Sequence, residues 1–178
     1  MRPEAPKDCP ICPRLAAFRA ANRIAYPTFF NGAVPSFGSE DARLLIVGLA
    51  PGLKGANRTG RPFTGDYAGE LLYATLLEFG FAAGTYRADP NDGFALVDAI
   101  ISNAVRCLPP ANKPEPSEIK NCNTFLTARI AALPRVKAIV ALGRIAHDAT
   151  LSALALKKSN YAFGHGTEHD LGSRRLFD

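Results

Sequence analysis

A loop rich in glycine and basic residues, GLAPGLKGANRTGRPFTGD, spans residues 48–66 directly after the apolar run LLIV. It contains five glycines and two prolines, and Arg58, Arg61 and Phe63 precede its last residue, Asp66. Its spacing matches neither the P-loop pattern G-x-x-x-x-G-K-[ST] nor the dinucleotide pattern G-x-G-x-x-G. Backbone amides beside glycines can still approach a phosphate, and a phenyl ring can stack on a base or pack beneath the loop. The loop is therefore a candidate ligand site.

Four cysteines form the second group of residues that can carry chemistry. Cys9 and Cys12 make a C-x-x-C pair in DCPICPRL, whereas fourteen residues separate Cys107 from Cys122. Prolines flank the first pair, which disfavours a thioredoxin-like redox motif. Zinc and an iron–sulfur cluster both accept four thiolates, and simple burial of the thiols is a third alternative. The wide spacing of the second pair indicates a staple across a domain rather than a compact zinc module.

The elements that must position these residues follow from the apolar pattern. Continuous apolar runs predict buried strands at residues 44–47 and 136–143, and a further strand that ends near Asn103 in FALVDAIISNAVRC. We expect four helices: one after the first cysteine pair with Leu15, Phe18 and Ile24 on its apolar face, one from Asp66 to Gly80, one from an N-cap at Ser117 through Ile130, and one over residues 144–156.

Alternation of continuous apolar strands with helices predicts an α/β fold with a mostly parallel sheet and helices on both faces. Ligands of such folds bind at the carboxyl ends of the strands. That rule places residues 48–66, Asn103 and Gly143 along one edge of the sheet. The sequence thus predicts a single site built from several loops.

Composition narrows the class of protein. A chain of 178 residues with 47% hydrophobic and 21% charged residues is sufficient for one domain with its own core. The net charge of +5 favours a polyanionic partner, although a solvated basic surface explains it equally well. No apolar stretch is long enough to cross a membrane, and MRPEAPKDCP lacks the apolar core of a signal peptide. We therefore expect a cytoplasmic protein, in which disulfides do not persist.

The segments GLAPG, NRTGRPFTGD and NAVRCLPPANKP, together with the cysteine spacing, resemble the family 5 uracil-DNA glycosylases. The resemblance runs from Asp8 to the last residue, and Leu49 and Ala50 favour this family over family 4, which carries an acidic residue at the position of Leu49. It implies a uracil-DNA-glycosylase-like three-layer α/β/α fold with a mostly parallel central sheet. It also implies DNA repair by hydrolysis of the N-glycosidic bond of uracil and other deaminated bases, after base flipping.

The resemblance also implies roles for individual residues. A [4Fe–4S] cluster would be held by Cys9, Cys12, Cys107 and Cys122, with a structural role. Asp66 would orient the attacking water or stabilise the positively charged sugar, unless it only caps the following helix. Asn103 would read the O4 and N3–H edge of uracil, unless it only bonds nearby backbone. Phe63 would stack on the flipped base.

The remaining candidates line the pocket or contact DNA. Backbone at Gly48, Ala50, Pro51 and Gly52 would line the pocket, and His165 would do so as well. Arg58, Arg61, Lys54 and Lys113 would contact phosphates or anchor loops, although each alone can be a solvated cation. A metal site at His165, His169 and Asp170 is the less favoured alternative to a short polar turn.

The chain departs from the family at its last residues. Family members carry a late His-Pro-Ser motif after a final strand, and this chain stops at RRLFD, where that segment begins. We therefore expect one domain over residues 1–178 that lacks this segment, and a monomer. The alternatives are a catalytically inactive nucleic-acid-binding protein on the same fold and a zinc-stabilised enzyme that acts on free nucleotides.

Overall fold

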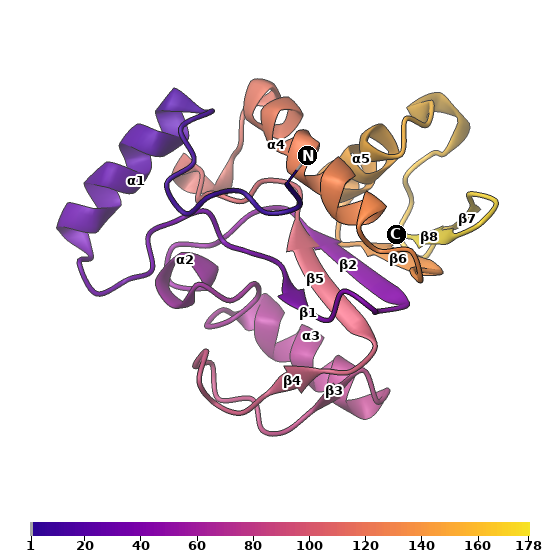
Figure 1. Cartoon of the computed structure of the whole chain (residues 1–178), viewed down its shortest axis with the longest axis horizontal. Coiled ribbons are helices and arrows are strands. Elements are labelled where there is room, and N and C mark those ends of the chain that lie inside the picture. Colours follow the sequence, from indigo (N-terminus) through magenta and orange to yellow (C-terminus); the bar gives the residue numbers. More distant parts are fainter. Residues whose placement is uncertain (1) are drawn as a thin grey trace.

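Apolar parallel strands form the centre of the structure, a computed structural model that describes residues 2–178 (Figure 1). The six-stranded sheet has the order β1-β5-β2-β6-β8-β7, in which β5, β2, β6 and β8 are parallel and the two edge strands are antiparallel to their neighbours. Its strands are β1 (Phe37–Gly38), β2 (Leu44–Gly48), β5 (Ala99–Asn103), β6 (Ala138–Ala141), β7 (Glu168–Asp170) and β8 (Arg175–Phe177). A separate hairpin pairs β3 (Ala82–Ala83) with β4 (Ala95–Leu96).

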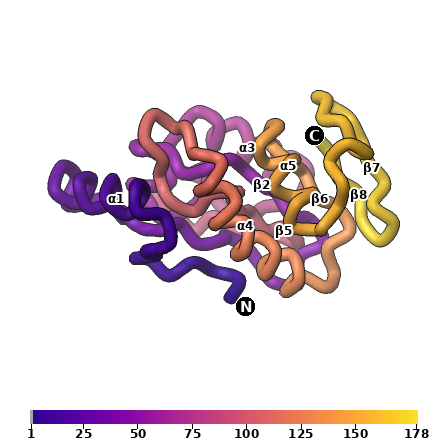
Figure 2. The backbone as a smooth tube through the Cα atoms, turned by 90° about the horizontal axis from the view of Figure 1, so that it is seen from above, coloured from indigo at the N-terminus to yellow at the C-terminus, as the bar shows by residue number. Residues whose placement is uncertain are grey.

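Helices cover both faces of the sheet. They are α1 (Pro13–Ala25), α2 (Ala56–Thr59), α3 (Tyr67–Glu78), α4 (Pro116–Ala131) and α5 (Arg144–Ala153), with short 3-10 turns at Pro110–Asn112 and Lys158–Asn160. In Figure 1, α4 and α5 lie on one face, and α3 lies with the β3–β4 hairpin on the other. Figure 2 shows α1 and the β7–β8 pair at opposite ends of the molecule. Within residues 2–178, no helix is long and apolar enough to span a membrane.

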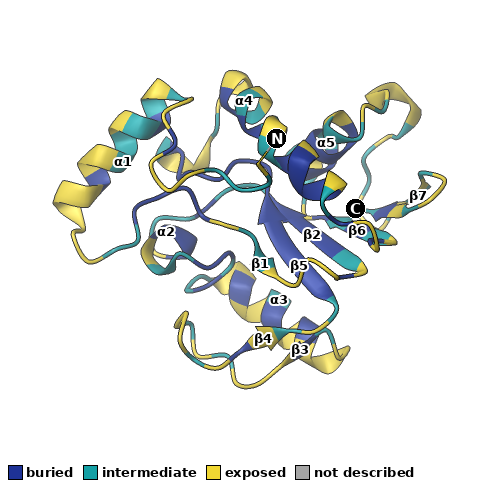
Figure 3. Ribbon diagram, in the orientation of Figure 1, coloured by how far each residue is buried: buried dark blue, intermediate teal, exposed yellow. Residues whose placement is uncertain are grey.

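The two cores explain why the central strands are continuously apolar. Side chains alternate across a strand, so Leu45 and Val47 pack in the core beneath α4 and α5, whereas Ile46 packs with Tyr73 and Leu76 of α3. Both faces of β2 and β5 are therefore buried, as Figure 3 shows. This confirms the predicted α/β architecture with its mostly parallel sheet and helices on both faces.

Two details of the predicted helices are wrong. Ser117 is not the N-cap of α4, because Pro116 occupies the first helical turn and Glu115 is the N-cap. A carboxylate oxygen of Glu118 accepts the backbone N–H of Glu115 at 2.8 Å, as in a capping box that starts at Glu115. Ile24 is 86% exposed, because α1 buries only Leu15 and Asn22 and lies beside the sheet rather than on it.

A buried ion pair clamps the loop that follows β2. Both terminal nitrogens of Arg61 bind the Asp92 carboxylate at 2.9 Å, and the two side chains are 5% and 0% exposed. Four aromatic rings lie 5.3–5.7 Å from the guanidinium carbon: Phe37, Tyr73, Tyr86 and Phe94. Of the two roles predicted for Arg61, the structure therefore favours the loop anchor, since the guanidinium is not available to a DNA phosphate.

The aromatic residues of this clamp also hold the loop backbone. The Tyr73 hydroxyl donates to the carbonyl of Pro62. The Tyr86 hydroxyl accepts the Gly65 N–H at 3.2 Å and donates to the carbonyl of Phe63 at 3.4 Å. Phe63 lies between these bonds with a φ of 52°, in the left-handed region that a bulky residue rarely adopts. The clamp thus holds Phe63 in a conformation that its own sequence disfavours.

A second charged cluster fastens the N-terminal segment to the domain. Glu4 binds Arg106 at 3.1 Å and Arg129 at 2.5 Å, and these guanidinium side chains are 1% and 4% exposed. Arg106 precedes Cys107, and Arg129 lies in the last turn of α4. One carboxylate therefore joins three parts of the chain that are far apart in sequence.

Asp92→Asn tests the loop clamp. Its hydrogen bonds with Arg61 hold the pKa of Asp92 well below its usual value. Such a group contributes stability above its unfolded pKa of about 3.9, and that stability is lost as the pH falls toward the folded pKa. We expect the variant to lose about 3 kcal/mol of unfolding free energy at pH 7, because Arg61 stays buried without its carboxylate.

Urea unfolding at pH 7, 5 and 3 measures this loss. The gap between the parent protein and Asp92→Asn should narrow at pH 3, and an equal gap at pH 3 and pH 7 would contradict the assignment. Asp98→Asn is the matched control, because Asp98 pairs with an Arg43 side chain that is 64% exposed, and we expect a smaller effect there.

Glu4→Ala tests the N-terminal tie. Removal of this carboxylate leaves the guanidiniums of Arg106 and Arg129 buried with fewer acceptors, and we expect a loss of about 2–3 kcal/mol in urea unfolding at pH 7. Glu40→Ala is the control, because Glu40 also binds Arg129 but its own side chain is 69% exposed. Equal small losses in the two variants would show that Glu4 is not the principal tie.

Candidate functional site

The predicted loops meet where β2 and β5 end side by side. Gly48 and Asn103, the last residues of these strands, are partners in the parallel register. The backbone continues the pairing for two more residues, since Ala104 and Val105 donate to the carbonyls of Gly48 and Leu49 at 2.8 and 2.9 Å. The glycine-rich loop leaves the sheet at this point, as the strand-end rule predicts.

A cavity of about 610 Å³ opens beside this edge. It is lined by Leu49, Ala50, Gly52, Phe63, Asp66, Ala68, Leu71, Leu72, Thr75, Asn112 and Leu142. The walls therefore come from the loop after β2, from α3, and from the segments that follow β5 and β6. A mostly apolar hollow of this size with a few polar groups is typical of a site for a small ligand or one nucleobase.

Gly48 allows two predicted site residues to approach each other. A Cβ atom at this position would lie 2.5 Å from Oδ1 of Asn103 and 2.6 Å from Cζ of the Phe63 ring. Any side chain here would displace one of them. Asn103 is 3% exposed, and its Oδ1 has no hydrogen-bond partner within residues 2–178. A buried acceptor without a partner is costly, so this amide is free to bind a ligand or a water molecule.

Asp66 has one carboxylate oxygen in the helix cap and the other at the cavity. Oδ1 accepts the backbone N–H of Gly69 at 2.9 Å, so Asp66 is the N-cap of α3. Oδ2 lies against the loop: a Cβ at Gly52 would be 3.6 Å away, and one at Gly55 would overlap it. The two interpretations of Asp66 are therefore compatible, because the cap orients the carboxylate and leaves Oδ2 accessible to a ligand.

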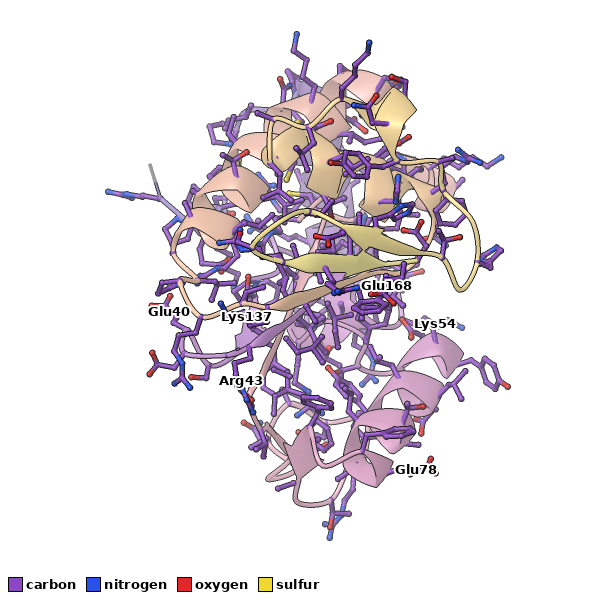
Figure 4. The ribbon with its side chains drawn as sticks, turned by 90° about the vertical axis from the view of Figure 1, so that its right-hand side faces the viewer. Glu40, Arg43, Lys54, Glu78, Lys137 and Glu168 are labelled. Atoms are coloured by element: carbon purple, nitrogen blue, oxygen red, sulfur yellow. The ribbon has the colours of Figure 1, made fainter. Side chains whose placement is uncertain are left out.

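Exposed cations surround this edge. Arg58 donates from Nε to the carbonyl of Lys54 at 2.9 Å and keeps the rest of its guanidinium at the surface. Lys54 and Lys113 are exposed as well. Figure 4 shows Lys54 near the start of α3, on the opposite side of the sheet from Arg43 and Lys137.

All four cysteines line one small cavity of about 20 Å³, and none of them forms a disulfide. Burial raises the pKa of Cys107 to about 11 and that of Cys122 to about 12. Three donors point at the sulfurs: Arg106 N to Cys122 at 3.2 Å, Arg19 Nη1 to Cys107 at 3.7 Å, and Asn121 Nδ2 to Cys12 at 3.7 Å. Such donors stabilise thiolates, as a metal centre requires.

The four cysteines converge on this one cavity although they lie in three separate parts of the chain. Tetrahedral zinc and an iron–sulfur cluster both accept four thiolates, so these side chains can hold either group.

None of the three histidines lines the 610 Å³ cavity. His165 packs against the ring of Phe163 and is not among the residues that line the 610 Å³ cavity, contrary to our expectation. His169 and His147 instead bind the buried Asp178 carboxylate, at 2.9 and 2.6 Å. Asp170 accepts the N–H of Gly172 at 2.7 Å, as in a polar turn. The histidine–aspartate cluster ties α5 to the β7–β8 pair.

Sequence reasoning identified part of the cavity and missed the rest. Ala50, Gly52, Phe63 and Asp66 line it as predicted. Gly48, Pro51 and Asn103 are buried and do not line it, although Gly48 lies against both the Asn103 amide and the Phe63 ring. The missed wall includes Leu71, Leu142 and Asn112. Only Leu71 carried a signal in the sequence, because it lies off the stripe formed by Leu72, Leu76 and Phe79. In the structure it is 64% exposed.

Comparison with known proteins agrees with this geometry. Residues 35–174 match the family described as the uracil DNA glycosylase superfamily. The chain is 42% identical over 174 residues to the type-5 uracil-DNA glycosylase of Thermus thermophilus, which covers 94% of this chain and 79% of that protein. The chain is also 37% identical over 174 residues to the type-5 uracil-DNA glycosylase of Pyrobaculum aerophilum. That match covers 96% of this chain and 76% of that protein.

A type-4 relative is more distant. The type-4 uracil-DNA glycosylase of Archaeoglobus fulgidus is 35% identical over 114 residues, which is 64% of this chain and 49% of that protein. Since the type-5 proteins match almost the whole chain and the superfamily match spans the cavity and both central strands, this chain belongs to the uracil DNA glycosylase superfamily, within its type-5 family.

Proposed function

We propose that this protein excises uracil from DNA by hydrolysing the N-glycosidic bond of a nucleotide flipped into the 610 Å³ cavity. The observation that carries this proposal is the position of Asp66, whose Oδ1 is held by the N-terminus of α3 while Oδ2 is left free at the cavity wall. The names of the type-5 relatives support the same activity.

The chemistry requires little covalent participation by the protein. Cleavage places positive charge on the sugar and negative charge on the departing base, so a fixed carboxylate beside the sugar lowers the barrier. We assign this role to Oδ2 of Asp66, which orients the attacking water or faces the developing cation. Its fixed orientation matters, because the Gly69 N–H prevents the carboxylate from turning away.

The base is held by three kinds of contact. The ring of Phe63 stacks on its face, and the Asn103 amide pairs with its O4 and N3–H edge. Backbone of Ala50 and Gly52 completes the wall. The unpartnered Oδ1 of Asn103 supports this assignment, because the N3–H of uracil supplies the donor that the protein does not.

We further propose that Cys9, Cys12, Cys107 and Cys122 hold a [4Fe–4S] cluster. The convergence of all four cysteines on one cavity and the donors directed at their sulfurs support a thiolate-bound metal centre, and the resemblance to the type-5 family favours the cluster over a zinc ion. The cluster would join the N-terminal segment to the end of β5 and to α4, and it takes no part in the hydrolysis. One chain carries every residue of the proposed site, which supports a monomer. The family match to a DNA-repair enzyme supports action in the cytoplasm.

Asp66→Asn is the direct test of the proposed function. Asparagine also caps helices, so α3 should remain intact while the negative charge is lost. With a labelled duplex that carries one uracil, alkali-induced strand cleavage should fall about 100-fold or more. Glu70→Gln, an exposed acid in the first turn of the same helix, should retain full activity. Unchanged cleavage by Asp66→Asn would remove the carboxylate from the mechanism.

The cluster is tested by composition and colour. Protein purified under anaerobic conditions should contain iron and inorganic sulfide in equal amounts. It should also absorb at about 400 nm, as clusters with thiolate ligands do. Cys122→Ala should lose both iron and colour, and should unfold at lower urea than the parent. Stoichiometric zinc without sulfide in the parent protein would refute the assignment.

A further inference from the structure

A second groove runs along the outer side of α2, away from the cavity that holds Asp66. Its volume is about 550 Å³, and it is lined by Thr28, Phe29, Phe30, Arg58, Thr59 and Pro90. An adjoining hollow of about 250 Å³ shares Phe30, Thr59 and Pro90 with it and extends past Gly60 to Pro62. The two hollows form one channel, which we call the α2 groove.

We propose that the α2 groove binds nucleotides of the damaged strand on one side of the flipped uracil, with bases stacked at Phe29 and a phosphate at Arg58. This inference rests on the proposed function, because it names where the same DNA strand continues after it leaves the cavity. It assigns the aromatic segment at residues 26–30 to DNA binding.

The aromatic residues offer the surface that single nucleotides require. Tyr26 is 36% exposed and stacks on Phe29 with ring centroids 4.9 Å apart and planes inclined by 18°. The ring of Phe30 carries the Lys7 ammonium 4.7 Å from its centroid. Aromatic rings beside cations bind successive bases without regard to sequence, because every base presents a π face and is linked to a phosphate.

The groove is preformed, because backbone hydrogen bonds join the segment at Phe30 and Asn31 to α2. The N–H groups of Phe30 and Asn31 donate to the carbonyls of Arg58 and Asn57 at 3.0 and 3.1 Å. The buried amide of Asn57 donates to Oδ1 of Asn31 at 2.9 Å. A Cβ at Gly60 would lie 2.7 Å from the Phe30 ring, so the glycine lets the ring pack against the helix end.

The charge of the groove suits a phosphate chain. Arg58, Lys54 and Lys7 are exposed, and none of them forms an ion pair with any residue from 2 to 178. Asp92, two residues after Pro90, is already paired with Arg61. Asp89 is the exposed acid that remains on that loop. Two unpaired cations, Arg58 in the lining and Lys7 over the Phe30 ring, therefore lie at the groove against one free carboxylate.

The groove adjoins the cavity through α2. Gly55, at the start of α2, lies against Oδ2 of Asp66, and a Cβ at Gly65 would be 2.5 Å from Nη2 of Arg58. Arg58 and Thr59 of the same short helix line the groove. A strand that leaves the cavity can therefore continue into the groove.

Substrate length tests this placement. Single-stranded oligonucleotides with one uracil extend either one or four nucleotides beyond the uracil on the 5′ or on the 3′ side, so that the flanking bases are free to stack on a ring. For the parent protein, we expect kcat/KM to rise about tenfold with the longer extension on one side only. Phe29→Ala should lose that gain and cleave the short substrate normally. Phe79→Ala, a ring that is 69% exposed at the far end of α3, should behave as the parent does.

Salt dependence tests the phosphate contact. The affinity for a single strand without uracil is measured by fluorescence anisotropy between about 50 and 200 mM salt. Over this range, binding through phosphate contacts weakens steeply. Arg58→Gln should reduce the slope of log K against log salt by about 0.7. Lys137→Gln removes the same charge at the opposite edge of the sheet and should leave the slope unchanged (Figure 4).

The outcomes separate the two proposals. If Phe29→Ala keeps the full gain from the longer extension, or Arg58→Gln keeps the parent's slope, the α2 groove does not bind the strand. If the parent excises no uracil but Arg58→Gln still lowers the salt slope relative to Lys137→Gln, the groove binds DNA and the proposed excision is wrong.

Discussion

The burial of one cation determines the shape of the site. Arg61 enters an aromatic enclosure and meets Asp92 there, and without this carboxylate the charge could not remain in so apolar a place. Because Arg61 lies two residues before Phe63, the same enclosure that accepts the guanidinium also holds the Phe63 backbone in its left-handed conformation. The loop is therefore rigid before any ligand arrives, which suits chemistry that depends on preorganised groups.

The glycines of the loop permit contacts with the site residues. Gly48 leaves room for Asn103 and the Phe63 ring, and Gly55 leaves room for the Asp66 carboxylate. Neither glycine has a positive φ, so the requirement here is steric rather than conformational. This explains a glycine-rich loop that fits no phosphate-binding pattern: its glycines bring side chains of the protein close together around a cavity.

Charge pairs far from the cavity hold the peripheral parts of the chain to the sheet. Glu4 joins the first residues to the end of β5 and to α4, next to the cavity lined by the four cysteines. His147 and Asp178 do the same for α5 and the β7–β8 pair. The central strands are mostly apolar, with Ser102 and Asn103 at the end of β5 as the polar exceptions, while polar networks at the margins hold the peripheral segments.

The sequence alone determined the α/β class, the central strands and the edge at which the loops gather, because continuous apolar runs and strand–helix alternation are local signals. It also proposed Asp66, Phe63 and Asn103 as site residues, through motifs in the loop after β2 and at the end of β5. Only the tertiary structure decided between equivalent residues of one loop: Arg58 is exposed and Arg61 is buried, although both are arginines of NRTGRPF. That difference depends on Asp92, thirty-one residues away, and no local pattern specifies such a contact.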